Sequence, residues 1–336
     1  MSSKSKIDPE IEAIIASITK EHGEGIINVL GKSWVANKNV LSTGSFILDQ
    51  AIGGGYVFGK MVEVYGEEGS GKTTFALQAV RECQKLGKRA VYVDVENALD
   101  IKHSQNIGVD TDQLITLHPE YGEQAFKLIL DILNHNQSQP KSKIGLIVID
   151  SVAALIPKGE LEGDLEKPLI GLHARMMASG LKQINHRLAG QAVIILLINQ
   201  IRNKISTGFF FGSTKTTTGG IALKYFANLR LELKEREKIE KGGECIGIKV
   251  SARIKKNRSG PPYKELPLEI MFKGGVQKER EIVDLATELN ILQKGGSWYS
   301  YAEKKLGQGK ENVVDYLTEN PVLAQELEEK IVEKIR

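Results

Sequence analysis

Two segments without polar alternation most constrain the fold of this chain. Residues 144–151 (IGLIVIDS) and 192–201 (AVIILLINQI) are apolar for most of their length. A strand of this kind is buried on both faces, as in a parallel sheet that helices cover on both sides. Residues 61–65 (MVEVY) and 89–96 (RAVYVDVE) are two further expected strands, and segments with helical periodicity separate the strands. The pattern predicts an α/β fold with a mostly parallel sheet flanked by helices.

Length and composition limit the class of protein. A chain of 336 residues suggests about two domains, and 45 basic against 42 acidic residues leave a formal net charge of +3. Two cysteines, Cys83 and Cys245, are too few for a disulfide framework and favour the reducing cytoplasm. The apolar stretches are too short to span a bilayer, and the first residues have no apolar signal core. We therefore expect a cytoplasmic protein with no membrane partner.

The chain divides where its pattern changes. Residues 1–34 contain one amphipathic helix, which Asp8 caps and which packs either on its own core or on a neighbouring subunit. Residues 35–276 hold the alternating strands and helices, and residues 277–336 are charged and helical with Gly-rich interruptions, which suggests a small C-terminal domain. Long connections without periodicity follow the two apolar strands, as functional loops often do.

The turn after the strand at 61–65 has a phosphate-binding motif, G-x-x-x-x-G-K-T. Its residues are Gly66, Glu67, Glu68, Gly69, Ser70, Gly71, Lys72 and Thr73. Glycines let the backbone N–H groups of such a turn face phosphate oxygens, and the following helix adds its positive N-terminal end. Lys72 would place a cation on the β- and γ-phosphates, and Thr73 would bind Mg²⁺. We therefore expect ATP and Mg²⁺ as ligands.

Two carboxylates complete the expected site. Asp150 ends the apolar strand at 144–151, where P-loop enzymes hold a metal-side carboxylate. An aspartate in this place also commonly caps a helix, but together with the P-loop the metal role is favoured. Glu96 ends the strand at 89–96 and is our candidate base for orienting water; the alternative is a surface glutamate without a role.

Further motifs resemble the bacterial RecA recombinases over nearly the whole chain, from about residue 7 to 321. The most specific are INQIR at 198–202, TTTGG at 216–220 and GGSWYSY at 295–301 with GQGK at 307–310. They separate the chain from replicative helicases and clock ATPases, which share only the fold. The resemblance implies a RecA-type P-loop ATPase core with an N-terminal helix and a small C-terminal α+β domain.

The resemblance also implies roles around the nucleotide. Glu96 would be the catalytic glutamate, and Gln200 would sense the γ-phosphate and move a DNA-binding loop. Thr74, Asp100 and His103 take positions that bind the nucleotide. His103 departs from the family pattern, because relatives stack a tyrosine on adenine there.

The resemblance places two DNA-binding loops at about residues 162–171 and 203–218. The residues that it implies on DNA are Ile170, Arg175, Lys182, Arg202, Asn203, Lys204, Thr218, Gly219 and Gly220. Ile170 replaces a methionine that wedges between bases, and Ile221 replaces an asparagine. Cations and backbone N–H groups bind phosphates without recognising sequence, which suits a protein that must accept any single strand.

A subunit interface is implied as well. Lys256 and Arg258 resemble the pair that reaches the neighbouring subunit's ATP, and Tyr225 takes an aromatic position linked to filament cooperativity. The N-terminal helix would then dock on the adjacent protomer. The expected assembly is a helical homo-oligomeric filament.

The implied function is ATP-dependent homologous recombination and recombinational DNA repair. A filament on single-stranded DNA would pair with homologous double-stranded DNA and exchange strands, with DNA-dependent ATP hydrolysis. The family also promotes self-cleavage of an SOS repressor, so the resemblance adds an SOS repressor and a single-strand-binding protein as candidate partners, and the sequence leaves open whether this chain has them. The alternatives are a hexameric motor with the same core, and a nucleotide-gated DNA scaffold that has lost hydrolysis; intact Lys72, Thr73, Glu96 and Asp150 disfavour the scaffold.

The last residues, 328–336, have mixed charge and apolar spacing, which predicts a helix of the C-terminal domain. Many RecA proteins finish instead in an acidic tail that competes with DNA. Without such a tail, we expect strand exchange at free Mg²⁺ only slightly above the amount that ATP binds.

Overall fold

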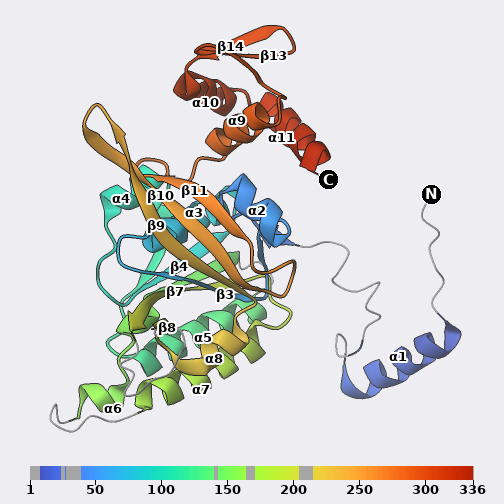
Figure 1. Cartoon of the computed structure of the whole chain (residues 1–336). Coiled ribbons are helices and arrows are strands. Elements are labelled where there is room, and N and C mark those ends of the chain that lie inside the picture. Colours follow the sequence, from blue (N-terminus) through green and yellow to red (C-terminus); the bar gives the residue numbers. More distant parts are fainter. Residues whose placement is uncertain are drawn as a thin grey trace, which may run out of the picture. The chain divides into compact units, whose positions relative to one another are not determined.

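The computed structural model describes residues 8–23, 27, 39–139, 143–163, 171–203 and 215–335 (Figure 1). It divides into two compact units, Met1–Asn39 and Val40–Arg336. The first contains α1 (Pro9–His22), whose N-cap Asp8 accepts a hydrogen bond from the N–H of Glu10 at 2.9 Å. The expected helix and its cap are therefore confirmed.

A large sheet forms the centre of the second unit (Figure 1). Its strands lie in the order β11 (Glu265–Met271), β10 (Glu244–Asn257), β9 (Leu229–Lys241), β3 (Met61–Gly66), β7 (Ile194–Asn203), β6 (Ile144–Asp150), β4 (Arg89–Asp94) and β5 (Ile115–Leu117). Neighbours from β9 to β5 pair in parallel, whereas β10 pairs antiparallel with both β9 and β11. The mostly parallel sheet is confirmed, and the antiparallel edge is an addition that the sequence patterns did not predict.

Helices cover both faces of this sheet, as expected for strands without polar alternation. The helices of the core are α2 (Phe46–Ile52), α3 (Lys72–Lys85), α4 (Ile101–Ile107), α5 (Gly122–Ser138), α6 (Lys158–Leu161), α7 (Leu172–Leu188) and α8 (Gly220–Phe226). In β6, Leu146 and Val148 join the apolar cluster of α3, while Ile147 and Ile149 join that of α5 and α7. Successive side chains of one strand thus bury on opposite faces.

Three smaller strands complete the core. Strand β1 (Val40–Leu41) pairs antiparallel with β2 (Tyr56–Val57), and β8 (Lys215–Thr217) pairs antiparallel with the end of β7. Two short 3-10 helices, Thr111–Gln113 and Val152–Ala154, follow α4 and β6. Within the described ranges, no helix combines the length and the apolar composition needed to cross a membrane.

The helices and strands of the C-terminal part (Figure 1) enclose an apolar core of their own. It consists of α9 (Lys278–Glu288), β12 (Gln293–Gly295), β13 (Trp298–Tyr301), β14 (Lys304–Gln308), α10 (Lys310–Glu319) and α11 (Pro321–Ile335). The glycine-rich interruptions form a three-stranded antiparallel sheet, in the order β12-β13-β14. The α+β character is therefore confirmed. Phe46 of α2 packs into this cluster, so the core contributes one aromatic side chain to it.

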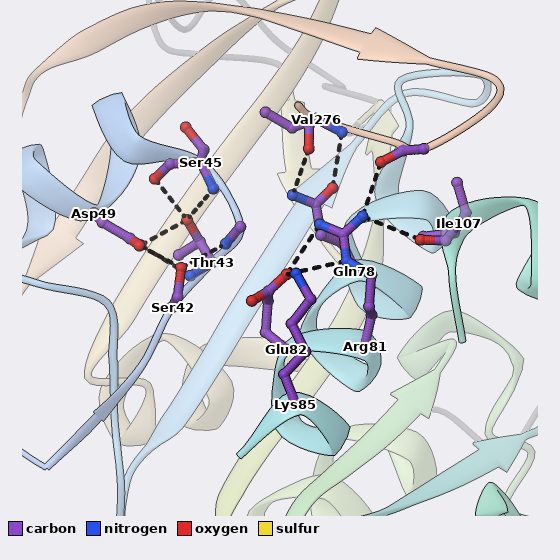
Figure 2. A network of polar contacts seen from close by, with 12 residues as sticks. Ser42, Thr43, Ser45, Asp49, Gln78, Arg81, Glu82, Lys85, Ile107 and Val276 are labelled. Carbon is purple, nitrogen blue, oxygen red and sulfur yellow. Dashed lines mark hydrogen bonds and ion pairs between the residues drawn. The ribbon is translucent and has the colours of Figure 1, made fainter. Parts of the chain in front are cut away.

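Side chains of α3 hold the segment between β11 and α9 (Figure 2). The amide of Gln78 donates to the Val276 carbonyl at 3.2 Å and accepts from the Val276 N–H at 2.9 Å. Arg81 donates to the carbonyls of Ile107 and Gly274 at 3.1 and 3.0 Å. Both side chains thereby fix the backbone that leads into the C-terminal domain.

A buried carboxylate joins α9 to α2. Glu281 accepts from the Ser45 hydroxyl at 2.8 Å and from the Ile47 N–H at 3.2 Å. Burial raises the pKa of Glu281 to about 7, and the nearby Asp49 carboxylate, whose own pKa burial raises to about 6, contributes in the same direction.

This carboxylate predicts a pH dependence of stability. The folded state binds its proton more tightly than the unfolded state, so Glu281 destabilises the fold progressively as pH rises from about 4.5 to about 7. The expected contribution is on the order of 3 kcal/mol. Glu281→Gln should flatten the decline of the unfolding free energy between pH 5 and pH 8 in denaturant titrations. Equal slopes for the two chains would contradict the assignment.

Candidate nucleotide and DNA site

The P-loop turn connects β3 to α3, as the sequence predicts. Gly71 has φ of +82°, a conformation that favours glycine, and a Cβ atom there would lie 2.5 Å from Ile270 Cδ1, so the end of that side chain would have to shift. The Lys72 ammonium donates to the Glu67 carbonyl at 2.6 Å, and the Ser70 hydroxyl donates to the same oxygen at 2.7 Å. Burial lowers the pKa of Lys72, while the carboxylates of Asp150, Glu96 and Glu68 oppose that effect.

The residues expected at the metal lie together. The Thr73 hydroxyl donates to Asp150 Oδ2 at 2.9 Å, and the Tyr92 hydroxyl donates to the same oxygen at 2.7 Å. Burial raises the pKa of Asp150 in spite of these two hydrogen bonds. A hydroxyl and a carboxylate are oxygen ligands of the kind Mg²⁺ prefers, with phosphates and waters supplying the rest. Among the described residues, no group of three His, Cys, Asp or Glu side chains could hold a metal ion.

Asp150 ends β6, the apolar strand on which the sequence placed it. In the sheet, β7 lies between β6 and the P-loop strand β3. The central strand β7 brings Gln200 to the edge of the site, because Gln200 pairs with Gly66 in the β3–β7 register.

Glu96 lies in this site but does not end its strand. Strand β4 stops at Asp94, whose carboxylate accepts the N–H groups of Ala98 and Leu99 at 3.1 Å each and so forms a turn. The expectation that the strand extends to Glu96 is therefore wrong. In the turn, Glu96 Oε1 accepts a short hydrogen bond from the Ser151 hydroxyl and one of 3.4 Å from the Gln200 amide.

A cavity of about 660 Å³ lies over these groups. Its lining includes Gly66, Glu68, Gly69, Gly71, Lys72, Thr73, Thr74, Glu96, His103, Asp150, Gln200 and Phe272. His103 Nε2 lies 3.4 Å from the Thr74 hydroxyl, and Asp100 caps α4 by accepting the His103 N–H at 2.5 Å. Asp100 thus orients the helix on which His103 lies.

Phe272 is a lining residue that the sequence analysis missed. It directly follows β11, its side chain is 48% exposed, and it belongs to none of the sequence motifs described above. An exposed aromatic side chain beside a phosphate site can stack on a base, as can the imidazole of His103. Its only sequence signal was an aromatic residue at the end of a strand, which is too common to indicate a ligand.

The described DNA candidates lie around α7 and the turn before α8. Arg175 and Lys182 are exposed and seven positions apart on α7, about two helical turns, so they share a face. Gly219 has φ of +89°, and a Cβ atom there would approach Val152 at 3.2 Å and Met177 of α7 at 3.4 Å. The structure therefore brings the Gly219–Gly220 turn against the helix that holds both cations.

The remaining DNA candidates are less completely described. Ile170 and Lys204 lie outside the described residues, as does most of each expected loop. Arg202 and Asn203 belong to the end of β7, and only their backbone is described. The connection expected to lack structure after Leu155 includes the short helix α6.

The interface candidates contact the C-terminal end of α8 in the same chain. The Lys256 ammonium donates to the carbonyls of Lys224 and Tyr225 at 2.8 and 2.9 Å, and Arg258 donates to the Tyr225 carbonyl at 3.1 Å. The Arg258 guanidinium also lies 5.8 Å from the centre of the Tyr225 ring, which is 65% exposed. Burial, with the neighbouring charge of Arg258, lowers the pKa of Lys256. Both cations thus stabilise the negative end of a helix dipole.

Strand β3, the glycine turn and the start of α3 place the chain among the P-loop nucleoside triphosphatases. In that class, backbone N–H groups and a lysine bind the phosphates, and a hydroxyl with a nearby carboxylate binds the divalent cation.

Comparison with known proteins narrows this class. A family model described as the RecA N-terminal domain matches residues 9–277, and one described as the RecA C-terminal domain matches residues 280–336. Curated relatives named Protein RecA include that of Legionella pneumophila, 42% identical over 96% of this chain and 90% of the relative. The protein of Acinetobacter baylyi is 43% identical over 97% of this chain and 91% of the relative. That of Mycoplasma mycoides is 43% identical over 95% of this chain and 90% of the relative.

The chain belongs to the RecA family. It is accordingly a recombination and DNA-repair protein of an ATP-binding and DNA-binding family.

Proposed function

We propose that the chain is a DNA-dependent ATPase that forms a filament on single-stranded DNA and catalyses homologous pairing and strand exchange. The observation that most supports this is the hydrogen bond between the Gln200 amide and Glu96 beside the P-loop. Gln200 lies on β7, which ends at Asn203, where the second expected DNA-binding loop begins. One strand thus connects the nucleotide cavity to the expected DNA contact.

In the proposed hydrolysis, Lys72 leaves the Glu67 carbonyl and donates to the β- and γ-phosphate oxygens of ATP. Thr73 and Asp150 would hold Mg²⁺, which neutralises developing phosphate charge. Glu96 orients the attacking water and accepts its proton, and Gln200 leaves Glu96 to contact the γ-phosphate. The products are ADP and inorganic phosphate.

Binding of DNA would use Arg175, Lys182 and the N–H groups of the turn at Gly219 and Gly220. These groups bind phosphates, so the contact would accept any base sequence. The proposed partners are single- and double-stranded DNA and further copies of the chain. An SOS repressor and a single-strand-binding protein are further proposed partners, on the resemblance alone, and we propose the cytoplasm as the location from the low cysteine count.

Electron microscopy on single-stranded DNA with ATP and Mg²⁺ tests this proposal. We expect open helical filaments, whose length follows the length of the DNA. Closed six-membered rings of constant size would support the hexameric motor instead and contradict our proposal.

Contact between subunits predicts complementation between two inactive variants. If Lys256 and Arg258 act on the neighbour's ATP, Lys256→Ala should impair hydrolysis although its own P-loop is intact. In a 1:1 mixture of Lys256→Ala and Glu96→Gln chains, about one interface in four combines an intact Glu96 with an intact Lys256. The mixture should therefore regain up to about a quarter of the unaltered rate. No gain in phosphate release from co-assembled filaments would contradict action across the interface.

A further inference from the structure

A buried polar network joins three strands of the sheet to the turn before α8. Its members are Glu63 of β3, Asn199 of β7, Arg230 of β9 and Thr218 after β8. Glu63 and Asn199 are both 0% exposed. Arg230 forms a short ion pair with Glu63 Oε2, and its guanidinium lies 4.8 Å from the centre of the Tyr65 ring. A carboxylate so deeply buried is tolerated only because both of its oxygens have partners.

Asn199 is the centre of this network. Its Nδ2 donates to Glu63 Oε1 at 3.0 Å and to the Thr218 carbonyl at 2.9 Å. Its Oδ1 accepts from the Gln200 N–H at 2.8 Å and, at short distance, from the Thr218 hydroxyl. The side chain thus uses two donor and two acceptor positions, which is its full capacity, and the four partners fix its orientation.

The network contacts both the nucleotide site and the turn proposed to bind DNA. On one side, Asn199 directly precedes Gln200, whose amide contacts Glu96 and which pairs with Gly66 of the P-loop. On the other side, Thr218 directly precedes the turn of Gly219 and Gly220. Thr218 thus forms the stem of the second expected DNA-binding loop, which we call the DNA-loop stem. Two of the four side-chain hydrogen bonds of Asn199 go to Thr218, so Thr218 cannot shift without breaking them or moving Asn199.

We propose that Glu63 and Asn199 are positioning residues that couple DNA at the turn of Gly219 and Gly220 to the placement of Gln200. Glu63, held by Arg230, fixes the amide of Asn199 from the P-loop strand, and that amide joins Thr218 to the backbone of Gln200. This inference rests on the proposed function, because it needs hydrolysis that DNA stimulates. Neither residue lines the nucleotide cavity, so neither is expected to contact ATP.

A double variant that exchanges the carboxylate at position 63 with the amide at position 199 tests the coupling while it keeps most of the bonds that hold the fold. In the double variant Glu63→Gln with Asn199→Asp, the new amide at position 63 can donate to the carboxylate at 199 and accept from Arg230. The carboxylate at 199 still accepts from the Thr218 hydroxyl and the Gln200 N–H. The contact between position 63 and Arg230 keeps a hydrogen bond but loses its ionic character. The carboxylate at 199 has no donor for the Thr218 carbonyl, so the link between position 199 and Thr218 loses a bond and gains a repulsion between two oxygens.

The readout is the rate of ATP hydrolysis with single-stranded DNA divided by the rate without it. Coupling between two sites typically amounts to about 5- to 150-fold, and we expect the double variant to lose about tenfold of its stimulation. Hydrolysis without DNA should stay within about twofold, because the P-loop contacts are unchanged. Full stimulation in the double variant would overturn the proposal. Absence of stimulation in the unaltered chain would instead refute the proposed function.

Gln78→Glu is the matched control. Gln78 is also fully buried and has both ends of its amide bonded, but its partner is Val276 (Figure 2), which has no bond to Glu63, Asn199 or Thr218 among the contacts of that network. This change should lower the melting temperature and leave the stimulation ratio unaltered. An equal loss of stimulation in Gln78→Glu would mean that the double variant reports general destabilisation, and would overturn the proposal.

Hydrogen exchange on the unaltered chain gives a second measurement. A non-hydrolysable ATP analogue, added without DNA, should slow exchange of the amides at residues 217–223, because Gln200 and Thr218 both form hydrogen bonds with the side chain of Asn199. Unchanged exchange there, with slower exchange at the P-loop proving that the analogue is bound, would overturn the coupling.

Discussion

Lys72→Ala is expected to abolish ATP-dependent binding to single-stranded DNA and to reduce hydrolysis by about 10²-fold or more. The Lys72 ammonium lies in the nucleotide cavity beside Asp150 and Glu96, and burial already disfavours its charged form. A triphosphate would add further negative charge beside Lys72, which favours the charged form of its side chain. Fluorescence anisotropy of labelled DNA, with and without ATP, measures the binding.

Lys85→Ala is the control for this experiment. Lys85 lies in the last turn of the same helix, where its 61% exposed side chain pairs with Glu82 at 2.9 Å. Without Lys85, Glu82 keeps its pair with Arg81 at 3.0 Å. Removal of this exposed cation is expected to change stability by about 1 kcal/mol or less and to leave nucleotide and DNA binding intact. ATP-dependent DNA binding by Lys72→Ala at the unaltered affinity would show that the P-loop has another role.

Glu96→Gln should retain ATP binding and slow hydrolysis by about 10²- to 10⁴-fold, as expected for loss of a base that orients water. The glutamine oxygen can still accept from Ser151 and Gln200, so the turn should keep its geometry. Single-turnover phosphate release measures the chemical step, and a nucleotide titration measures binding.

Glu96→Asp provides a graded comparison. It keeps the carboxylate but withdraws it by one methylene, so the rate should fall between those of the unaltered chain and Glu96→Gln. If Glu96→Gln hydrolyses ATP at the unaltered rate, another group orients the water.

Much of this site was predictable because its signals are local. The P-loop glycines, Lys72 and Thr73 are contiguous, and the strand and helix on either side have clear apolar patterns. Asp150 was found in the same way, at the end of an unbroken apolar strand. Its distance in the sheet from β3 was not predictable, since strand order depends on contacts far apart in the chain.

Other features depend on side-chain chemistry that a strand pattern does not reveal. The apolar alternation of 89–96 continues past Asp94, but the carboxylate of Asp94 bonds two backbone N–H groups ahead and ends the strand. Strands β9 and β10 extend into a highly charged hairpin, LKEREKIEKGGE at 233–244, whose charges hide their β pattern. The bond between Glu63 and Asn199 joins residues 136 positions apart, and no local pattern could indicate it.

Strand exchange itself tests the central claim most directly. The measurement pairs a circular single strand with a homologous linear duplex in the presence of the chain, ATP and Mg²⁺, and follows joint molecules and nicked circular product by gel electrophoresis. We predict that product forms with ATP and a homologous duplex, and that it is absent with a non-homologous duplex or with Lys72→Ala. Hydrolysis of ATP on single-stranded DNA without any exchanged product, or unwinding of the duplex without pairing, would contradict the account.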